Sequence, residues 1–343
     1  MQHPLSIATD NNKPVPAGWY TVCAADALKP GTLLAFELAR LKLLAWRSES
    51  GTVSVADRRC PHMGGDLGRG QVSGETLRCP IHHFAFDAHG QCQSTGFADV
   101  SSKACLKPWP LMEINGLVLV FYHPQAAAPQ WQPEAFDWQG WSQQRVHSTV
   151  LNADVQLITE GIADKGHLNT VHGYSDVSLD QPFETDGAKL TTAYSFTNSG
   201  SLPGSGKLSQ WLSRLLPLQM QVAFDYQAWG LGYSFTEVHI PKLGVRMRHF
   251  VNPTPVNNNE VKLFYSIALG PVNPADLHPL LKAVPASWVR ALLFRALHKG
   301  FLHDINDDIA MWSSMQPLEK PQLCKADGPV NKFRQWAQQF YSQ

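Results

Sequence analysis

The chain has 343 residues, of which 44% are hydrophobic and 16% are charged, so it is predicted to form two domains, or one large domain, with a substantial core. Its 28 basic and 28 acidic residues give a formal net charge of zero, and no basic patch favours nucleic-acid binding. No apolar run approaches the ~20 residues of a membrane span, and the first residues lack the pattern of a secretory signal peptide.

Short strand-like stretches with turn signals between them dominate the N-terminal part of the sequence. They cover residues 18–22, 32–46, 53–57, 76–78, 84–87, 105–110 and 117–122. This spacing predicts an all-β unit over residues 15–124. Residues 1–13 are polar, and we expect a loose segment there.

Two pairs of metal-binding side chains lie inside this unit. Cys60-x-His62 is followed, after sixteen residues, by Cys79-x-x-His82. Two thiolates and two imidazoles at this spacing suit one inorganic cluster between two loops, as in a Rieske [2Fe–2S] centre. A structural zinc site also uses two cysteines and two histidines, but zinc fingers usually pair C-x-x-C with H-x₃₋₅-H.

The stretches PHMGG and CPIHHFAFDAHGQC resemble the two cluster loops of Rieske proteins. The resemblance implies that Cys60, His62, Cys79 and His82 bind a [2Fe–2S] cluster. Respiratory Rieske proteins carry a further cysteine in each loop, and these loops do not, so the resemblance is to the branch that feeds oxygenases. His83 stands where many members have glycine.

Six cysteines are present: Cys23, Cys60, Cys79, Cys92, Cys105 and Cys324. Two are assigned to the cluster and the other four are scattered. This usage predicts buried thiols in a reducing compartment, not a disulfide framework, and hence a cytoplasmic protein.

Three prolines between residues 124 and 133 indicate a connection to a second domain, predicted over residues 125–343. This domain contains the stretch ITEGIADKGHLNTVHG at residues 158–173. Asp164 and His167 are spaced to share a helix face. His167 and His172 are five residues apart, so they reach one metal only if the helix ends or distorts between them. Taken alone, H-x₄-H is a weak signal.

This stretch resembles the iron-site signature of the large subunit of Rieske non-haem iron oxygenases. The resemblance implies that His167 and His172 bind a mononuclear Fe(II), with a carboxylate completing a facial triad. The candidates lie in the stretch HDINDDIAMW: Asp304, Asp307 and Asp308, with His303 beside them. In the family this acid commonly precedes an aromatic residue by four positions, and Asp308 with Trp312 fits that pattern.

The remaining sequence predicts strands at residues 190–198, 219–228, 232–240, 245–250 and 261–269, then a helix over 286–315. An antiparallel sheet covered by iron-bearing helices matches the helix-grip domain of the resembled family, so the whole chain is expected to be α+β. Residues 207–216 predict an amphipathic helix that packs on the core, lids the substrate entrance or rests on a membrane surface.

The resemblance extends over both domains to 3-ketosteroid 9α-hydroxylase and cholesterol 7-desaturase-like oxygenases. It implies a terminal oxygenase that uses O₂ and takes electrons from NAD(P)H through a separate ferredoxin or flavin reductase. Family members form rings, usually homotrimers, in which Asp164 would bridge His82 of a neighbouring subunit to His167. Monooxygenation or desaturation is favoured over cis-dihydroxylation.

Few charges between residues 190 and 250 favour an apolar, polycyclic substrate that is hydroxylated, desaturated, demethylated or cyclised. Arg246 and Arg248 remain candidates for binding an acidic group. Two alternatives stay open: a Rieske electron carrier, and a lipid-binding module without oxygenase activity.

Overall fold

The computed structural model describes residues 14–98, 101–199, 219–257, 259–277 and 279–341. Its N-terminal region is all β. One sheet has the order β1 (Gly18–Ala24), β10 (Leu117–Tyr122) and β9 (Leu111–Ile114). A second contains β2 (Thr32–Leu38), β3 (Leu41–Arg47) and β4 (Val53–Asp57). A third contains β5 (Gln71–Ser73), β6 (Thr76–Arg78), β7 (Ala85–Phe86) and β8 (Cys92–Ser94). The predicted strand at 105–110 is wrong, because this stretch makes only isolated bridges.

Strand β1 joins the N-terminal region to the rest of the molecule. It is buried on both faces, since successive side chains of a strand point in opposite directions. Tyr20 lies in the core with Leu38 of the N-terminal region. Trp19 lies in a separate aromatic cluster with Tyr233 and Phe250 of the C-terminal region. One strand therefore contributes to two hydrophobic cores.

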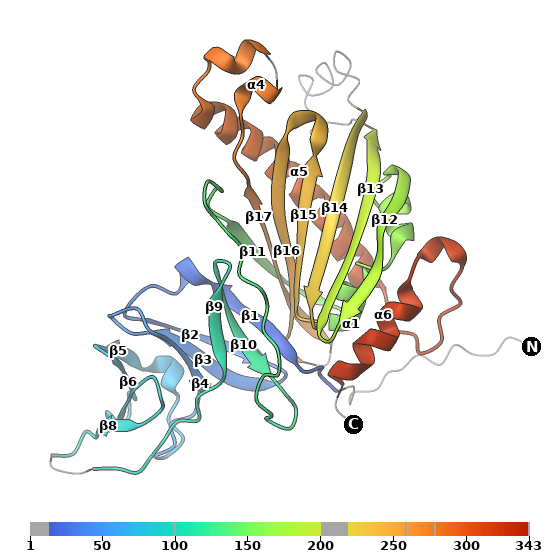
Figure 1. The fold of residues 1–343 in the computed structure, drawn as a ribbon. Coiled ribbons are helices and arrows are strands. Elements are labelled where there is room, and N and C mark those ends of the chain that lie inside the picture. The colour runs from blue at the N-terminus through green and yellow to red at the C-terminus, as the bar shows by residue number, and fades with distance from the viewer. Residues whose placement is uncertain (1–13, 99–100, 200–218, 258, 278, 342–343) are drawn as a thin grey trace, which may run out of the picture.

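The C-terminal region is built on a seven-stranded antiparallel sheet. Its order is β11 (Arg145–Asn152), β17 (Glu260–Leu269), β16 (Val245–Pro255), β15 (Tyr233–Ile240), β14 (Gln219–Trp229), β13 (Lys189–Ser199) and β12 (Ser175–Asp186). The helices are α1 (Val155–Glu160), α2 (Lys165–Thr170), α4 (Pro274–Leu277), α5 (Ala286–Ser314) and α6 (Val330–Ala337). Figure 1 shows α5 lying across one face of the sheet. The α+β prediction is confirmed, although β11 and β12 were not predicted.

Short 3₁₀ segments complete the described elements: η1 (Ala25–Ala27), η2 (Leu67–Arg69), η3 (Pro241–Leu243), η4 (Pro279–Ala283), η5 (Lys325–Asp327) and η6 (Gln338–Phe340). The amphipathic helix predicted at 207–216 lies outside the described residues. Among the helices that are described, none has the length and apolar run needed to cross a membrane.

Alternation along β16 separates the two faces of the large sheet. His249 faces the helices, where its ring centroid lies 4.5 Å from that of Phe301. Arg248 points the other way and lies over the ring of Trp141, 3.9 Å from its centroid. Arg246 is on that same face and pairs with Glu237. Neither arginine therefore reaches the helix-covered face, where the candidate iron ligands lie.

All six cysteines are free thiols. Cys23, Cys60 and Cys79 are buried, but Cys105 and Cys324 are exposed. The expectation that the four scattered cysteines are buried is therefore wrong for these two.

Candidate functional site

The first candidate site consists of two loops at the tip of the N-terminal region. Cys60 and Cys79 are 3% and 2% exposed. The Cys60 amide donates to the Gly65 carbonyl, and the Cys79 amide donates to the Phe84 carbonyl, both at 2.8 Å. The structure thus brings both thiols into one buried position, one from each loop.

The two histidines of this site lie side by side and half-buried. The ring centroids of His62 and His82 are 4.8 Å apart, edge to face. His62 stacks on Phe84 with the centroids 4.2 Å apart. Burial, together with the adjacent Cys79, raises the pKa of the Cys60 thiol to about 11. Two buried thiolates therefore require positive charge beside them, which fits a metal cluster.

Backbone conformation explains two residues of these loops. A Cβ on Gly65 would lie 3.1 Å from Sγ of Cys79 and 2.9 Å from Cγ1 of Ile81, so this position needs glycine. His83 has a left-handed φ of 56°, which accounts for the glycine that many family members carry there. His83 is exposed, as expected of a loop residue.

An ion pair that the sequence analysis missed braces the first loop. Nε and Nη2 of Arg58 each donate to a carboxylate oxygen of Asp66 at 2.6 Å. Asp66 also accepts from the Gly68 amide at 2.9 Å and caps η2. The Arg58 guanidinium lowers the pKa of Asp66 to about 2. In the sequence, Arg58 lies two residues before Cys60 and Asp66 directly follows Gly65, and this spacing could have predicted the ion pair.

The second candidate site begins at the turn between α1 and α2. Asp164 caps α2, because its carboxylate accepts from the His167 amide at 3.3 Å. The predicted shared helix face is therefore wrong for Asp164, which precedes the helix. Nδ1 of His167 lies 2.5 Å from the backbone oxygen of Asp164, and the carboxylate is 3.9 Å from the same nitrogen. With Nδ1 donating to that oxygen, Nε2 of His167 is left as a lone-pair donor for a metal.

Helix α2 ends between the two histidines, as their spacing requires. It stops at Thr170, and the Val171 amide closes it by donating to the His167 carbonyl at 2.8 Å. Gly173 just beyond has a left-handed φ of 69°. The ring centroids of His167 and His172 are consequently only 5.3 Å apart.

Asp308 on α5 completes this group. Its Oδ1 lies 3.1 Å from Nε2 of His172, without hydrogen-bond geometry. One donor atom from each of His167, His172 and Asp308 lies within 4.8 Å of the others. Burial alone would lower the pKa of His172, but Asp308, together with Asp304 and Asp307, outweighs it and the net pKa is raised. Two imidazoles and one carboxylate converging in this way fit a mononuclear iron.

The other two acids of α5 have different partners. Asp304 accepts a hydrogen bond from the Tyr174 hydroxyl at 2.9 Å. Burial raises the pKa of that carboxyl, opposed by the Tyr174 hydrogen bond. The Asp307 side chain is 40% exposed and lies 3.9 Å from His303. Neither is part of the converging group.

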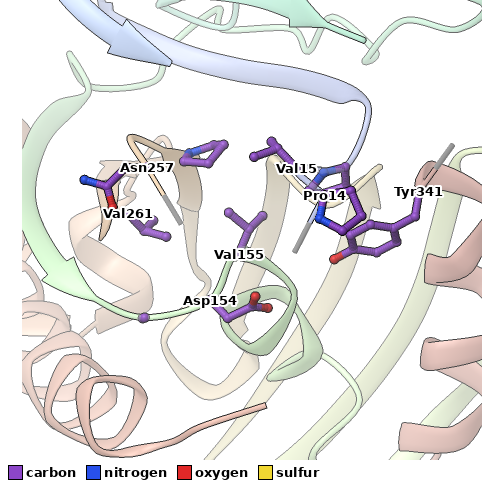
Figure 2. A pocket seen from close by; sticks show the side chains of 10 residues that line it. Pro14, Val15, Asp154, Val155, Asn257, Val261 and Tyr341 are labelled. Atoms are coloured by element: carbon purple, nitrogen blue, oxygen red, sulfur yellow. The ribbon is translucent and has the colours of Figure 1, made fainter. Parts of the chain in front are cut away.

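A cavity of about 100 Å³ adjoins His167, His172 and Asp308. Its apolar side chains come from α1 and the turn after it, from α2, from the sheet and from α5. A second cavity, of about 30 Å³, lies between the N-terminal segment, the start of α1 and the C-terminus; Figure 2 shows Val15, Val155 and Tyr341 around it. Its volume suits about one water molecule, whereas the group of metal-binding side chains found among the described residues adjoins the larger cavity. The larger cavity is therefore the candidate active site.

Comparison with known families agrees with this arrangement. The model of the Rieske [2Fe-2S] domain matches residues 18–105, and that of the 3-ketosteroid 9alpha-hydroxylase C-terminal domain matches residues 120–341. The chain belongs to the 3-ketosteroid 9α-hydroxylase family. It is a Rieske non-haem iron oxygenase.

Relatives of this oxygenase align along most of its length. A cholesterol 7-desaturase of Xenopus laevis is 28% identical over 349 residues, covering 95% of this chain and 72% of the relative. The oxygenase component of a 3-ketosteroid-9-alpha-monooxygenase of Rhodococcus rhodochrous is 25% identical over 335 residues, covering 94% and 82%. Dicamba monooxygenase bound to dicamba shares the fold, with a TM-score of 0.66 and 15% identity over 94% of this chain and 96% of that one.

Proposed function

We propose that this chain is the terminal oxygenase component of a multicomponent system that oxidises an apolar, polycyclic or steroid-like molecule with O₂. The convergence of His167, His172 and Asp308 on a mostly apolar cavity carries the proposal. Electrons would come from NAD(P)H through a separate ferredoxin or flavin reductase. Hydroxylation and desaturation are the reactions that the names of the relatives support.

The ligand assignments are part of this proposal. Cys60, Cys79, His62 and His82 would hold a [2Fe–2S] cluster, and His167, His172 and Asp308 would hold Fe(II). When bound, the cluster supplies one-electron transfer and the iron supplies oxygen activation. The protein orients His167 through the Asp164 carbonyl. The Tyr174–Asp304 hydrogen bond fixes the cavity wall beside His172, whose ring stacks on Tyr174 at 5.3 Å.

We infer a homotrimer in which the cluster of one subunit lies against Asp164 of the next. The Asp164 side chain is 32% exposed beside a nearly buried His167, so it links the surface to the site. Large apolar side chains surround the cluster tip and are exposed: Met63 (75%), Ile81 (58%) and Phe97 (50%). In Figure 1 the strands β5, β6 and β8 of the tip lie far from α1, which favours electron transfer between subunits.

The cavity restricts the choice of substrate. Of the described residues that line it, none is Lys or Arg. Its volume is below the ~300–1,000 Å³ of typical ligand pockets, so a polycyclic substrate must displace wall side chains such as Phe224 and Phe301. We also propose domain limits of 15–124 and 125–343 and a cytoplasmic location, where free thiols stay reduced.

Iron and sulfide content of anaerobically purified protein tests the proposal. We expect about three irons and two acid-labile sulfides per chain, with a Rieske signal in the EPR spectrum of the reduced protein. Asp308→Ala should lose about one iron and keep that signal. Asp307→Ala is the matched control and should keep three irons. Two irons in the wild type after Fe(II) reconstitution would instead leave an electron carrier or a lipid-binding module.

A further inference from the structure

The sheet side of the cavity carries a row of three polar side chains. Tyr226 on β14 is paired with Thr236 on β15, and Thr236 is paired with His249 on β16. All three line the cavity. Because neighbouring strands lie about 4.8 Å apart, the row spans about 10 Å across the sheet. Thr236 therefore lies between the other two side chains, so a ligand oxygen beside it has Tyr226 on one side and His249 on the other.

These polar groups lack hydrogen-bond partners among the residues that the structure describes. Nε2 of His249 is buried without a hydrogen bond, and neither the Tyr226 nor the Thr236 hydroxyl bonds to any described residue. Two other hydroxyls of the same cavity are satisfied. Thr159 donates to the Leu231 carbonyl at 2.7 Å, and Ser234 donates to the Val251 carbonyl at 2.6 Å. Because buried polar groups are normally paired, the unpaired row calls for a ligand.

The surroundings of the row are apolar. The next row of the sheet contains Phe224, Val238 and Met247, which follow the same register. Across the cavity, Phe301 lies against the His249 ring and Ile305 follows it on α5. A ligand here meets a polar strip at one wall and hydrocarbon on most other sides.

The electrostatics of the cavity favour a neutral ligand group. Burial lowers the pKa of His249 to about 3, so its imidazole is uncharged near neutral pH. The charged side chains that line the described cavity are the acids Asp304 and Asp308. A ligand carboxylate at the row would lose its hydration without gaining a cationic side chain as partner, since no Lys or Arg is among the described lining residues. A carbonyl can accept a hydrogen bond from the row, and a hydroxyl can accept or donate one, without the cost of desolvating a charge.

We propose that the row formed by Tyr226, Thr236 and His249 binds a neutral carbonyl or hydroxyl oxygen at one end of an apolar substrate and discriminates against a carboxylate. This assignment rests on the proposed function, because the row then determines which part of the substrate faces His167, His172 and Asp308. These three side chains are positioning residues for the substrate.

Binding of three steroids with one skeleton tests this assignment. Equilibrium dialysis of the iron-loaded enzyme without O₂ would compare 5α-androstane, 5α-androstan-3-one and the corresponding 3-carboxylic acid. We expect the ketone to bind about tenfold more tightly than the hydrocarbon, since a neutral hydrogen bond contributes about that factor. The acid should bind most weakly.

Variants assign the preference to the row. Thr236→Val keeps the shape of the side chain and removes only the hydroxyl, and Tyr226→Phe does the same. Each should reduce the advantage of the ketone about three- to tenfold, as should His249→Phe, while affinity for the hydrocarbon stays within about twofold. The control is Ser234→Ala, whose hydroxyl is already bonded to Val251, and it should leave the ratio unchanged.

Three results would overturn the assignment: equal loss of ketone and hydrocarbon binding, strongest binding of the acid, or no binding of any steroid. The comparison of the three steroids on the wild-type protein is sufficient to test the assignment, so the test does not depend on whether each variant folds. Failure of the proposed function gives a different result. A wild-type protein that prefers the ketone but contains only two irons per chain would contradict the oxygenase proposal and leave this assignment intact. An active enzyme with three irons per chain that does not prefer the ketone would contradict this assignment and leave the oxygenase proposal intact.

Discussion

The cluster loops take all four candidate ligands from residues 60–82, whereas the candidate iron site joins a turn near residue 167 to a helix near residue 308. The cluster tip is also open to solvent, with Met63 75% exposed, while His167 is 9% exposed. An electron-entry site has to approach a partner, and an oxygenation site has to exclude water. The two sites should therefore respond separately to substitution.

The largest expected effect concerns the buried support of the iron site. Arg334 on α6 donates two hydrogen bonds to Glu160 at the end of α1, at 2.7 and 2.8 Å. The Glu160 carbonyl accepts from the Asp164 amide at 3.2 Å, next to His167. Arg334→Met leaves a buried carboxylate uncompensated and should lower the free energy of unfolding by about 3–5 kcal/mol. Urea unfolding measures the change in the free energy of unfolding, and iron analysis of the same samples measures the loss of mononuclear iron.

A double variant sharpens this prediction. Glu160→Leu combined with Arg334→Met removes both charges and should recover most of the lost stability. The cluster EPR signal should be unchanged in the single variant, which loses mononuclear iron first. Simultaneous loss of cluster and iron would show that the two sites do not respond separately.

Asp164→Asn should have the next largest effect, on turnover. Asparagine also caps helices well, so α2 and the His167 amide contact should persist. The negative charge at the exposed end of the site is lost, and we expect NADH-driven turnover to fall about 10- to 100-fold. Iron content should stay at about three per chain. An unchanged rate would exclude Asp164 as the link between subunits.

Gly65→Ala tests the other site, the two cluster loops of the N-terminal region. The added Cβ would press on Sγ of Cys79 and on Cγ1 of Ile81, at a cost of about 1–3 kcal/mol. Acid-labile sulfide per chain should fall while mononuclear iron stays near one per chain. Gly18→Ala is a control for the substitution itself, since the nearest atoms to its added Cβ belong to the Tyr20 side chain at 3.8–3.9 Å, an ordinary van der Waals contact. Equal sulfide loss in both variants would contradict the packing argument.

The same contrast explains what the sequence could predict. The cluster ligands are local, so spacing alone brought Cys60, His62, Cys79 and His82 forward. The break between His167 and His172 followed from helix periodicity and is present. Selecting Asp308 over its neighbours required family resemblance, because three acids on one helix are equivalent until the helix is docked.

Features that depend on strand pairing were out of reach. Thr236 and His249 become neighbours only through the register of β15 and β16. Arg248 and His249 are adjacent in sequence but face opposite sides of the sheet. The alternation of side chains between the two faces of a strand, from Arg246 to Val251, was the signal in the sequence that could have predicted this separation.

The smallest expected effect concerns the Arg58–Asp66 pair. The folded pKa of Asp66, about 2, lies below its ordinary value of 3.8, so its ionised form stabilises the fold above that value. The stabilisation is lost as pH falls from about 4 towards 2. Both side chains are about 30% exposed, at 30% and 27%, so Asp66→Asn should cost at most about 1 kcal/mol at pH 7.

Urea unfolding at several pH values, followed by circular dichroism, measures the difference between wild type and Asp66→Asn. The difference should be constant from about pH 7 to 5 and should narrow below about pH 4, where the unfolded carboxyl becomes protonated. Arg58→Met removes the other partner and should show the same narrowing. A difference that stays constant down to about pH 3 would mean that the ion pair with Arg58 does not account for it, because asparagine keeps the cap on η2.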